Sequence, residues 1–243
     1  MDIKSELLSC LNGNIISNNQ SILSNVSRET LDSKPCVFSS NDAEASVVEE
    51  FWCRIQKFVA LLEEWNLKMN LVSKNSMAEV WTRHVLDSAQ LFPLLPMNLQ
   101  RLVDIGSGAG FPAMVLAVML KAKHSPAEVI MVESITKKAA YLQDVSQKLG
   151  LTNVRVINDR VENIAFNNVD VITARAVAAL DVLCGYICKA GNKNTHALLL
   201  KGQGYATEEA EAQKHWQYQK KIYSNKYSND GVIMDLWGIR KKK

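Results

Sequence analysis

The sequence predicts an α/β fold, with a mostly parallel seven-stranded sheet, helices on both faces and a helical extension at the N-terminus. Three observations support this prediction. Short apolar runs alternate with helical stretches from about residue 102 onward, which is typical of parallel strands joined by helices. A glycine-rich turn follows the first of these runs. Two further β-rich runs, separated by an Asp-Gly turn, predict a hairpin in the C-terminal part.

Length and composition fit a soluble globular protein. The 243 residues are 47% hydrophobic and 22% charged, which is enough to bury a core without disulfide bonds. The longest apolar run, 113–120, is too short to span a bilayer, and the first residues lack the pattern of a signal peptide. The five cysteines form no CxxC pair. We therefore expect a cytoplasmic protein with reduced thiols.

Charge is distributed unevenly along the chain. Residues 1–50 contain three basic and eight acidic side chains, whereas residues 51–243 contain 25 basic and 17 acidic ones. A basic body is compatible with a phosphate-rich partner. A soluble surface with uneven charge explains these numbers equally well, so they assign no partner by themselves.

Residues 1–43 form the first of three predicted segments, a leader. Apolar residues at helical spacing predict a short amphipathic helix at its start: Ile3, Leu7, Leu8 and Leu11. The remainder of the leader is rich in serine and asparagine, which predicts a weakly ordered linker. Because it contains few large apolar side chains, we expect the leader to bury little surface and to be dispensable for folding.

Residues 44–100 are expected to form a helical segment packed on the core. Apolar side chains recur every three or four residues from Val47 to Trp65, which indicates one long helix with a buried face and makes Trp65 a core anchor. A second helix is predicted from about 77 to 91, where the prolines that follow end it.

The third segment, 101–243, contains the predicted sheet. Strands are expected at 102–105, 129–133, 154–158, 169–173, 197–200, 220–227 and 232–239. Helices are expected at 111–123, 136–149 and 177–190. Cys184 and Cys188, on the last of these helices, are expected to pack in the core. Residues 241–243 are all lysine and are expected to form a frayed, solvated end.

The most informative segment is the turn after the first strand, which contains Gly106, Gly108 and Gly110. Glycine lets a backbone approach a ligand where a Cβ atom would collide. The dinucleotide-binding fingerprint requires its third glycine where Phe111 stands, and the lysine of a phosphate-binding loop is missing. A pyrophosphate-binding turn is therefore disfavoured.

Two carboxylates accompany the glycine turn. Asp104 precedes it, and Glu133 ends the second predicted strand, where a carboxylate can accept hydrogen bonds from the two hydroxyls of a ribose. A positively charged sulfonium tolerates nearby carboxylates that would repel a pyrophosphate. The turn and the carboxylates together favour S-adenosylmethionine as the cofactor over a purely structural turn.

Six short motifs occur in order within residues 45–205. They are 65–71 (WNLKMNL), 83–88 (RHVLDS), 104–112 (DIGSGAGFP), 160–162 (RVE), 173–176 (TARA) and 200–202 (LKG). Together they resemble the bacterial small-subunit (16S) ribosomal RNA guanine-N7 methyltransferases, the RsmG or GidB family. The chain departs from the family pattern at Met69, Ala109 and Ala113, where the changes are small for small or apolar for apolar.

The resemblance implies a Rossmann-like class I S-adenosylmethionine-dependent methyltransferase that modifies N7 of a guanine in small-subunit ribosomal RNA. It implies cofactor contacts from Gly106, Phe111, Val161, Glu162 and Arg175, to which the general pattern of such enzymes adds Asp104, Glu133 and the rest of the turn, Gly108 and Gly110. Guanine N7 has a free lone pair and no proton to lose, so we expect no general base and assign no catalytic residue. Candidates for the substrate mouth are Arg83, His84, Asp87 and Lys201.

The expected partner is small-subunit ribosomal RNA or a ribosomal particle. We expect the protein to act as a monomer, to have no metal site, and to bind neither DNA nor a membrane. A small-molecule methyltransferase, or a non-catalytic RNA-binding or ribosome-assembly protein that keeps the cofactor pocket, remains an alternative. Arg175 could contact cofactor or RNA, or it could pair with Asp170 or Asp104. His84 and Asp87 share a helix face and could line the substrate mouth or simply fix that helix to the glycine turn.

Overall fold

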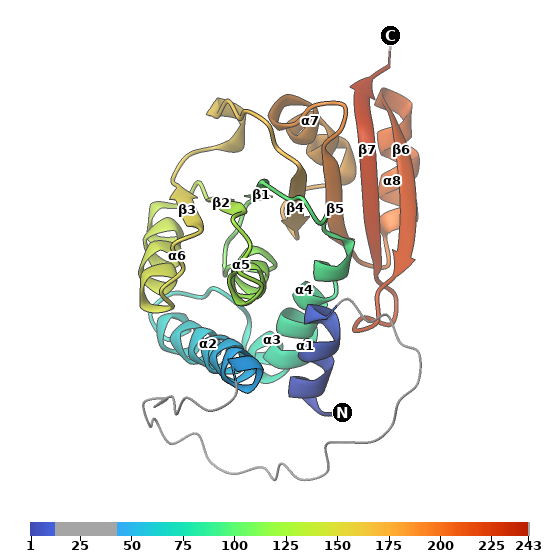
Figure 1. Ribbon diagram of the computed structural model, residues 1–243. Helices are drawn as coiled ribbons and strands as arrows, with labels where there is room; N and C mark the ends of the chain where they lie inside the picture. The colour runs from blue at the N-terminus through green and yellow to red at the C-terminus, as the bar shows by residue number, and fades with distance from the viewer. Residues whose placement is uncertain (13–42, 243) are drawn as a thin grey trace.

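The computed structural model describes residues 1–12 and 43–242, and in this part of the chain seven strands form a sheet with helices on both faces (Figure 1). The strands are β1 (Arg101–Ile105), β2 (Glu128–Val132), β3 (Val154–Ile157), β4 (Val171–Arg175), β5 (His196–Lys201), β6 (Trp216–Ser224) and β7 (Val232–Lys241). Their order is β3-β2-β1-β4-β5-β7-β6. The first five strands are parallel, and β7 is antiparallel to β5 and β6. The prediction of a mostly parallel seven-stranded sheet is confirmed.

The order of the strands places a ligand site next to β1. The chain moves outward from β1 to β2 and β3, and it then returns to the other side of β1 with β4 and β5. Open α/β sheets bind ligands at the carboxyl ends of the strands where the order reverses in this way. The carboxyl ends of β1, β2 and β4 are therefore the edge on which the candidate residues converge.

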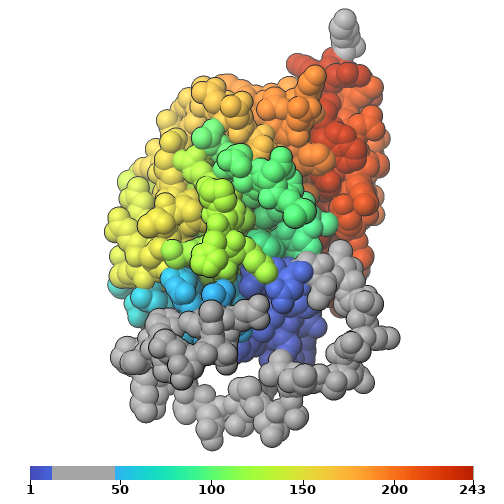
Figure 2. All heavy atoms as spheres, in the orientation of Figure 1, coloured from blue at the N-terminus to red at the C-terminus, as the bar shows by residue number. Residues whose placement is uncertain are grey.

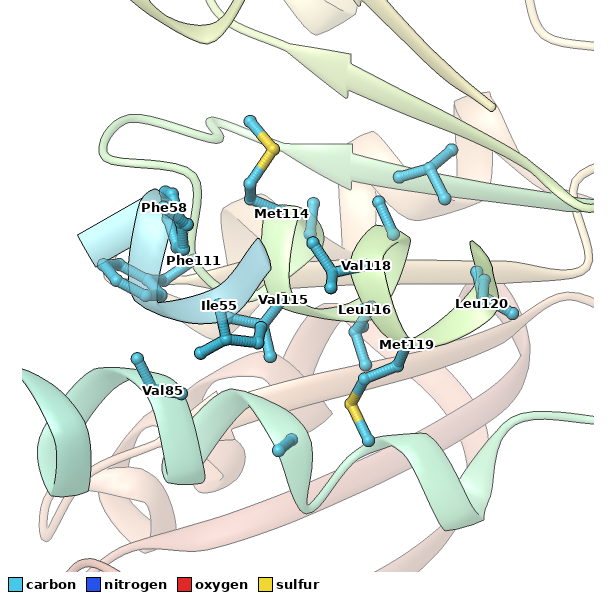
Figure 3. Packing of buried hydrophobic residues seen from close by; sticks show 14 of the residues in the cluster. Ile55, Phe58, Val85, Phe111, Met114, Val115, Leu116, Val118, Met119 and Leu120 are labelled. Atoms are coloured by element: carbon cyan, nitrogen blue, oxygen red, sulfur yellow. The ribbon is translucent and has the colours of Figure 1, made fainter. Parts of the chain in front are cut away.

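Helices cover the two faces unequally. They are α1 (Ile3–Leu11), α2 (Ala43–Asn66), α3 (Lys74–Ala78), α4 (Asp87–Ala89), α5 (Ala113–Ala122), α6 (Thr136–Lys148), α7 (Leu180–Ala190) and α8 (Tyr205–His215), with a π-helical segment η1 (Trp81–Leu86) and short 3₁₀ turns at Phe92–Leu94 and Val161–Asn163. One apolar cluster joins α1, α2, α5 and α6 to the sheet, and a second joins α7 and α8 to the other face. Helix α5 is buried from Ala113 to Leu120 because it lies between the sheet and α2, where Ile55 and Phe58 approach it (Figure 3).

The helix expected at 77–91 is interrupted. Helix α3 ends at Ala78, and the chain passes through η1 before α4 begins at Asp87. π-Helical turns are rare in proteins, but those that do occur are often found at functional sites. Here the segment carries His84 and leads directly into Asp87, and both side chains are buried.

Helix α8 and the first residues of β6 were missing from the expectation. Only Ala212 is a buried apolar residue in α8, so this helix has no apolar stripe to reveal it. Strand β6 begins at Trp216 because it pairs along its length with β7, as far as Lys241. Strand β4 begins at Val171, two residues later than expected.

The expectation that the leader buries little is wrong for α1. Leu7 is fully buried and Leu11 is 5% exposed, and both belong to the larger core cluster. The Tyr227 hydroxyl donates a hydrogen bond to Glu6 at 2.8 Å. In the space-filling view α1 lies directly against the body of the molecule (Figure 2). The predicted linker falls outside the described residues except at its ends.

Several smaller expectations are corrected by the packing. Cys184 is buried as expected, but Cys188 is exposed because it lies one position off the apolar face of α7. Among the described cysteines, Cys10, Cys184 and Cys188 are free.

The C-terminal lysines are ordered rather than frayed. Lys241 pairs with Trp216 in the sheet, and the Lys242 N–H donates to the His215 carbonyl at 2.8 Å; Lys243 lies outside the described residues. Trp65 is a core anchor as expected, because it packs against the larger cluster and its indole N–H donates to Asp144 at 2.9 Å. Within the ranges given above, no helix combines the length and apolar character that a membrane span requires.

Candidate functional site

The glycine turn lies on the carboxyl end of β2. The Gly106 and Ser107 N–H groups both donate to the Val132 carbonyl, at 2.9 and 3.0 Å. Gly106, Gly108 and Gly110 have φ values of +69°, +51° and +92°, a region that favours glycine. The backbone conformation of the turn therefore depends on all three glycines.

The three glycines differ in what surrounds them. A Cβ atom on Gly106 would lie 2.7 Å from the Val177 side chain, and one on Gly110 would lie 3.2 Å from Met114. A Cβ atom on Gly108 would meet only the Gly106 carbonyl oxygen, at 3.7 Å. Gly106 and Gly110 are thus needed for packing within the protein, whereas Gly108 leaves an open face where a ligand can approach the backbone.

Asp104 lies at the floor of this region with one oxygen unsatisfied. It is 1% exposed, and its Oδ1 accepts a hydrogen bond from the Thr173 hydroxyl at 2.6 Å. Its Oδ2 has no hydrogen-bond partner. Burial raises the pKa of the Asp104 carboxyl to about 7. An unpartnered buried carboxylate oxygen fits a cationic or hydrogen-bond-donating group of a ligand.

Glu133 connects the turn to the end of β2. Its Oε2 accepts from the Gly108 N–H at 2.9 Å, and its Oε1 accepts from the Ile135 N–H at 2.8 Å. Each carboxylate oxygen has a second lone pair, so the side chain can still accept two hydroxyl hydrogens. Glu133 therefore both shapes the turn and offers the acceptors that a ribose requires.

Val161 and Glu162 follow β3, in the 3₁₀ turn Val161–Asn163. The Val161 side chain is 7% exposed and packs in the smaller core cluster, so a ligand contact here would use its backbone. The Glu162 carboxylate accepts from the Tyr186 hydroxyl at 3.1 Å and lies 3.5 Å from Arg160. These two residues follow the strand next to β2, one strand further out than Glu133, and the Glu162 side chain contacts α7 through Tyr186.

Arg175 ends β4 and is mostly buried. Its Nη2 donates to His84 Nδ1, and its Nη1 lies 3.4 Å from Asp87 Oδ2. Asp87 Oδ1 accepts from Gln90 at 2.9 Å and from Asn225 at 2.6 Å. Among the pairings that the sequence left open, the structure thus selects Asp87 for Arg175.

The two other carboxylates considered for Arg175 have different partners. Asp170 Oδ2 accepts from the backbone N–H groups of Gln100 and Arg101, both at 2.8 Å. Asp104 is bound by Thr173 on the neighbouring strand. Arg175 therefore pairs with neither Asp170 nor Asp104, because both carboxylates bind groups on or beside their own strands.

His84 is held in one tautomer. A guanidinium group can only donate, so His84 Nδ1 accepts from Arg175 and Nε2 carries the proton that is shared with the Ser76 hydroxyl at 2.8 Å. Burial, and secondly the charge of Arg175, lower the pKa of His84 to about 4. His84 is therefore a neutral hydrogen-bond acceptor for Arg175 near neutral pH.

Phe111 joins the glycine turn to this polar cluster. Its ring stacks on His84 with centroids 4.9 Å apart, and it contacts Phe58 at 5.2 Å. The Arg175 guanidinium lies 6.0 Å from the ring centroid. Because the ring is enclosed by protein, any cofactor contact from Phe111 would come from its backbone.

A cleft of about 880 Å³ opens at the carboxyl ends of β4 and β5. Three of the four substrate-mouth candidates line it, namely Arg83, Asp87 and Lys201, and Arg175 lies in its wall. His84 lies behind this wall and contacts Arg175. The structure thus brings the four candidates to one place, with His84 in a supporting position.

Lys201 ties the loop after β4 to α8. Its ammonium group donates to the Ala178 carbonyl at 3.1 Å and to Glu208 at 2.7 Å. Glu208 also accepts from the Leu180 N–H at 2.9 Å, at the start of α7. Lys201 therefore shapes one wall of the cleft.

Sequence reasoning missed three residues of this region. Ala176 has φ +53° directly after Arg175, and such strain in a non-glycine residue is common at functional sites. Val177 covers Gly106, and Asn225 reaches Asp87 from the turn between β6 and β7. The only sequence feature that pointed to Ala176 is its place in the motif 173–176. No sequence feature pointed to Val177 or Asn225.

Two solved structures show the same fold at low identity. A mutant of MtNAS in complex with S-adenosylmethionine superposes with a TM-score of 0.51 at 17% identity, over 81% of this chain and 80% of that chain. A TehB-like SAM-dependent methyltransferase from Corynebacterium glutamicum has a TM-score of 0.50 at 11% identity, over 74% of this chain and 98% of the other. The predicted Rossmann-like fold of class I methyltransferases is confirmed.

Sequence relatives are much closer. A family model described as GidB, rRNA small subunit methyltransferase G, matches residues 53–231. The ribosomal RNA small subunit methyltransferase G of Paramagnetospirillum magneticum is 38% identical over 193 residues, which cover 79% of this chain and 91% of the relative. The protein of that name from Bartonella tribocorum is 39% identical over 202 residues, which cover 82% and 93%.

Proposed function

We propose that the methyl acceptor of this enzyme is N7 of a guanine, starting from its family. The chain belongs to the rRNA small subunit methyltransferase G family. It is therefore an S-adenosylmethionine-dependent enzyme that methylates small-subunit ribosomal RNA. Family membership removes the small-molecule and non-catalytic alternatives that the sequence left open. The enzyme acts in rRNA processing by RNA methylation.

One observation supports the choice of N7: the central titratable groups of the cleft are already committed to one another. His84 Nδ1 accepts from Arg175, Asp87 is hydrogen-bonded and ion-paired, and the Lys201 ammonium group is bound to Glu208. A general base must be free to take the proton that it removes, whereas these cleft groups are paired with one another. Guanine N7 has no proton to remove, so it suits a cleft whose acidic and basic side chains serve to hold each other in position.

The residues at the edge of β1 and β2 fit S-adenosylmethionine. We assign the ribose hydroxyls to the free lone pairs of Glu133, and the cationic amino-acid part to the neighbourhood of Asp104, whose Oδ2 has no other partner. The open face of Gly108 leaves room for close backbone contact. When bound, the cofactor supplies a methyl group on a positively charged sulfur.

Catalysis by this chain is then a matter of position. Arg175 is fixed by His84 and Asp87, so its side chain can hold cofactor or RNA in one orientation without further ordering. The polar side chains of Ser228 and Asn229, which line the cleft, can bind the edges of an unstacked base. The basic excess of the body supplies affinity for phosphates that does not depend on sequence.

We also propose a cytoplasmic monomer whose partner is ribosomal RNA or a ribosomal particle, and which binds neither DNA nor membranes. The support is the nature of the substrate and the basic excess of the body, with 25 basic and 17 acidic side chains in residues 51–243.

The proposed acceptor is tested by mapping N7-methylguanine in small-subunit ribosomal RNA after incubation with the purified protein and S-adenosylmethionine. Single-turnover rates at saturating enzyme and cofactor are measured between about pH 6 and pH 9. We expect N7-methylguanine at one position and a flat pH profile, because no proton leaves the acceptor. A steep rise of the rate with pH, or a methyl group on an exocyclic amine or a hydroxyl, would contradict the proposal.

A further inference from the structure

A second concave region lies at the opposite end of the sheet from the cleft. It has a volume of about 880 Å³ and is formed where β6 begins and β7 ends. Its lining combines three cations, Arg240, Lys241 and Lys242, with the aromatic residues Trp216 and Tyr218 and two glutamines. Among the described residues that line it, none is acidic. We call this region the distal groove.

The cations of the distal groove are held by the sheet. Arg240 pairs with Gln217 and Lys241 pairs with Trp216 in the β6–β7 ladder. The Arg240 Nε–H donates to the Gln217 side chain at 3.3 Å, and the Lys242 ammonium group donates to the Gln213 carbonyl. Positive charge that is presented by an ordered backbone binds an anion with a smaller loss of conformational entropy than charge on a flexible tail.

Acidic side chains close to the groove have partners other than its three cations. Asp181 accepts from His215 at 2.9 Å and from the Trp216 indole N–H at 3.0 Å. Glu211 pairs with Lys214, and Glu209 pairs with Lys220. The positive charges of Arg240, Lys241 and Lys242 are therefore not neutralised by these carboxylates.

We propose that the distal groove binds the phosphate backbone of the small-subunit ribosomal RNA, as a contact separate from the cleft; this inference rests on the proposed function. Strand β7 connects the two regions, since Val232 pairs with Lys201 at the cleft and Lys241 pairs with Trp216 at the groove. Ten residues at ~3.3 Å each separate them by about 30 Å. One RNA molecule that fills both regions must span this distance, so the groove selects a folded substrate over a short strand.

The test uses the full chain with a triple variant, Arg240→Gln, Lys241→Gln and Lys242→Gln. Its control, Lys121→Gln, Lys148→Gln and Arg155→Gln, changes the net charge equally on α5, α6 and β3. Affinity for folded small-subunit ribosomal RNA is measured by filter binding across a series of salt concentrations. We expect the groove variant to lose at least tenfold in affinity and to lower the slope of log affinity against log salt by about 2, because each lost phosphate contact removes about 0.7–0.9.

The control separates a local contact from an effect of net charge. We expect it to change the affinity by less than threefold and to keep the slope. Equal losses in both variants, or an unchanged slope in the groove variant, would overturn the proposal and leave the groove to a different partner. Lys241→Glu, a single exposed substitution, checks the result with less risk to folding, and we expect it to weaken RNA binding in the same direction.

A second arm keeps this inference distinct from the proposed function. With a short oligonucleotide that carries the target guanine and cannot reach the groove, we expect the groove variant and the wild type to have equal single-turnover rates. A selective loss with the oligonucleotide would place the groove residues in the chemistry and contradict the proposal. If the wild type makes no N7-methylguanine, the proposed function fails, while the binding comparison still decides whether the groove holds RNA.

Discussion

Glu133 is the side chain on which most of the cofactor assignment depends. It holds the Gly108 and Ile135 N–H groups and keeps free lone pairs at the end of β2. We predict that Glu133→Ala weakens S-adenosylmethionine binding by about 1–3 kcal/mol, the usual cost of leaving buried polar groups unpaired. Calorimetry measures the effect, with Glu128→Ala at the other end of β2 as the control. Unchanged affinity in a folded Glu133 variant would remove this residue from the site.

His84 accepts a hydrogen bond from Arg175 and also packs its ring against Phe111, and substitutions can separate these two effects. His84→Phe keeps a ring against Phe111 but removes the acceptor, and we predict a lower methylation rate, by about tenfold, which corresponds to one hydrogen bond of about 1.4 kcal/mol. His84→Asn places a carbonyl oxygen near the position of Nδ1 and should restore much of the rate. Rates are compared at saturating cofactor and RNA. Equal rates for Phe and Asn variants would show that only packing matters.

At the scale of elements, the glycine turn contains one position for a ligand and two for packing. Gly108→Val places a side chain on the open face, so we predict loss of cofactor binding with a cooperative thermal transition retained. Gly150→Val is the control, because this glycine also has a positive φ (+65°) and open surroundings but lies at the end of α6. Normal cofactor binding by the Gly108 variant would make the turn purely structural.

Helix α1 is a part of the core although the leader as a whole looked dispensable. Leu7 is fully buried among residues of the larger cluster, and we predict that Leu7→Ala lowers the free energy of unfolding by about 2–5 kcal/mol. Leu67→Ala is the matched control, since Leu67 is 90% exposed, and it should cost less than about 0.5 kcal/mol. Denaturant unfolding of both variants provides the comparison. A Leu7 variant as stable as the control would mean that α1 does not contribute to the folded core.

For the whole molecule, two buried groups make stability depend on pH in opposite directions. The pKa of Asp104 is raised from 3.8 to about 7, so the cofactor-free folded state holds a proton that the unfolded chain has lost, and stability falls as pH rises from 4 to 7. The pKa of His84 is lowered from 6.5 to about 4, so its contribution is present above pH 6.5 and is lost as pH falls towards 4. In the wild type the two effects offset each other over this window.

The two contributions can be separated by substitution. We predict that Asp104→Asn makes the free energy of unfolding rise more steeply with pH between 4 and 6.5, and that His84→Phe makes it fall with pH over the same range. Each variant is unfolded in denaturant at several pH values without cofactor. Parallel curves for the wild type and both variants would show that neither group titrates differently in the folded and unfolded states.

Local patterns in the sequence were sufficient for much of this protein. Near-continuous apolar runs located β1, β2 and β5, because strands covered on both faces need apolar residues at every position. The glycine turn and its two carboxylates were visible because their spacing is short and their chemistry is specific. Ordered motifs along the chain identified the family, and the relatives confirm it. The individual cofactor contacts remain predictions.

Tertiary structure alone decided which side chains meet. Arg175, His84 and Asn225 converge on Asp87 or on one another from β4, η1 and the β6–β7 turn, and no local pattern encodes contacts between such distant segments. Helix α8 escaped notice because it buries almost no apolar residue, and α1 was misjudged because spacing shows an apolar face but not the surface that receives it. The C-terminal lysines line the distal groove only because β7 pairs with β6. Burial and backbone preference are local properties that a sequence displays, whereas the partner of a charge depends on the order of strands in the sheet.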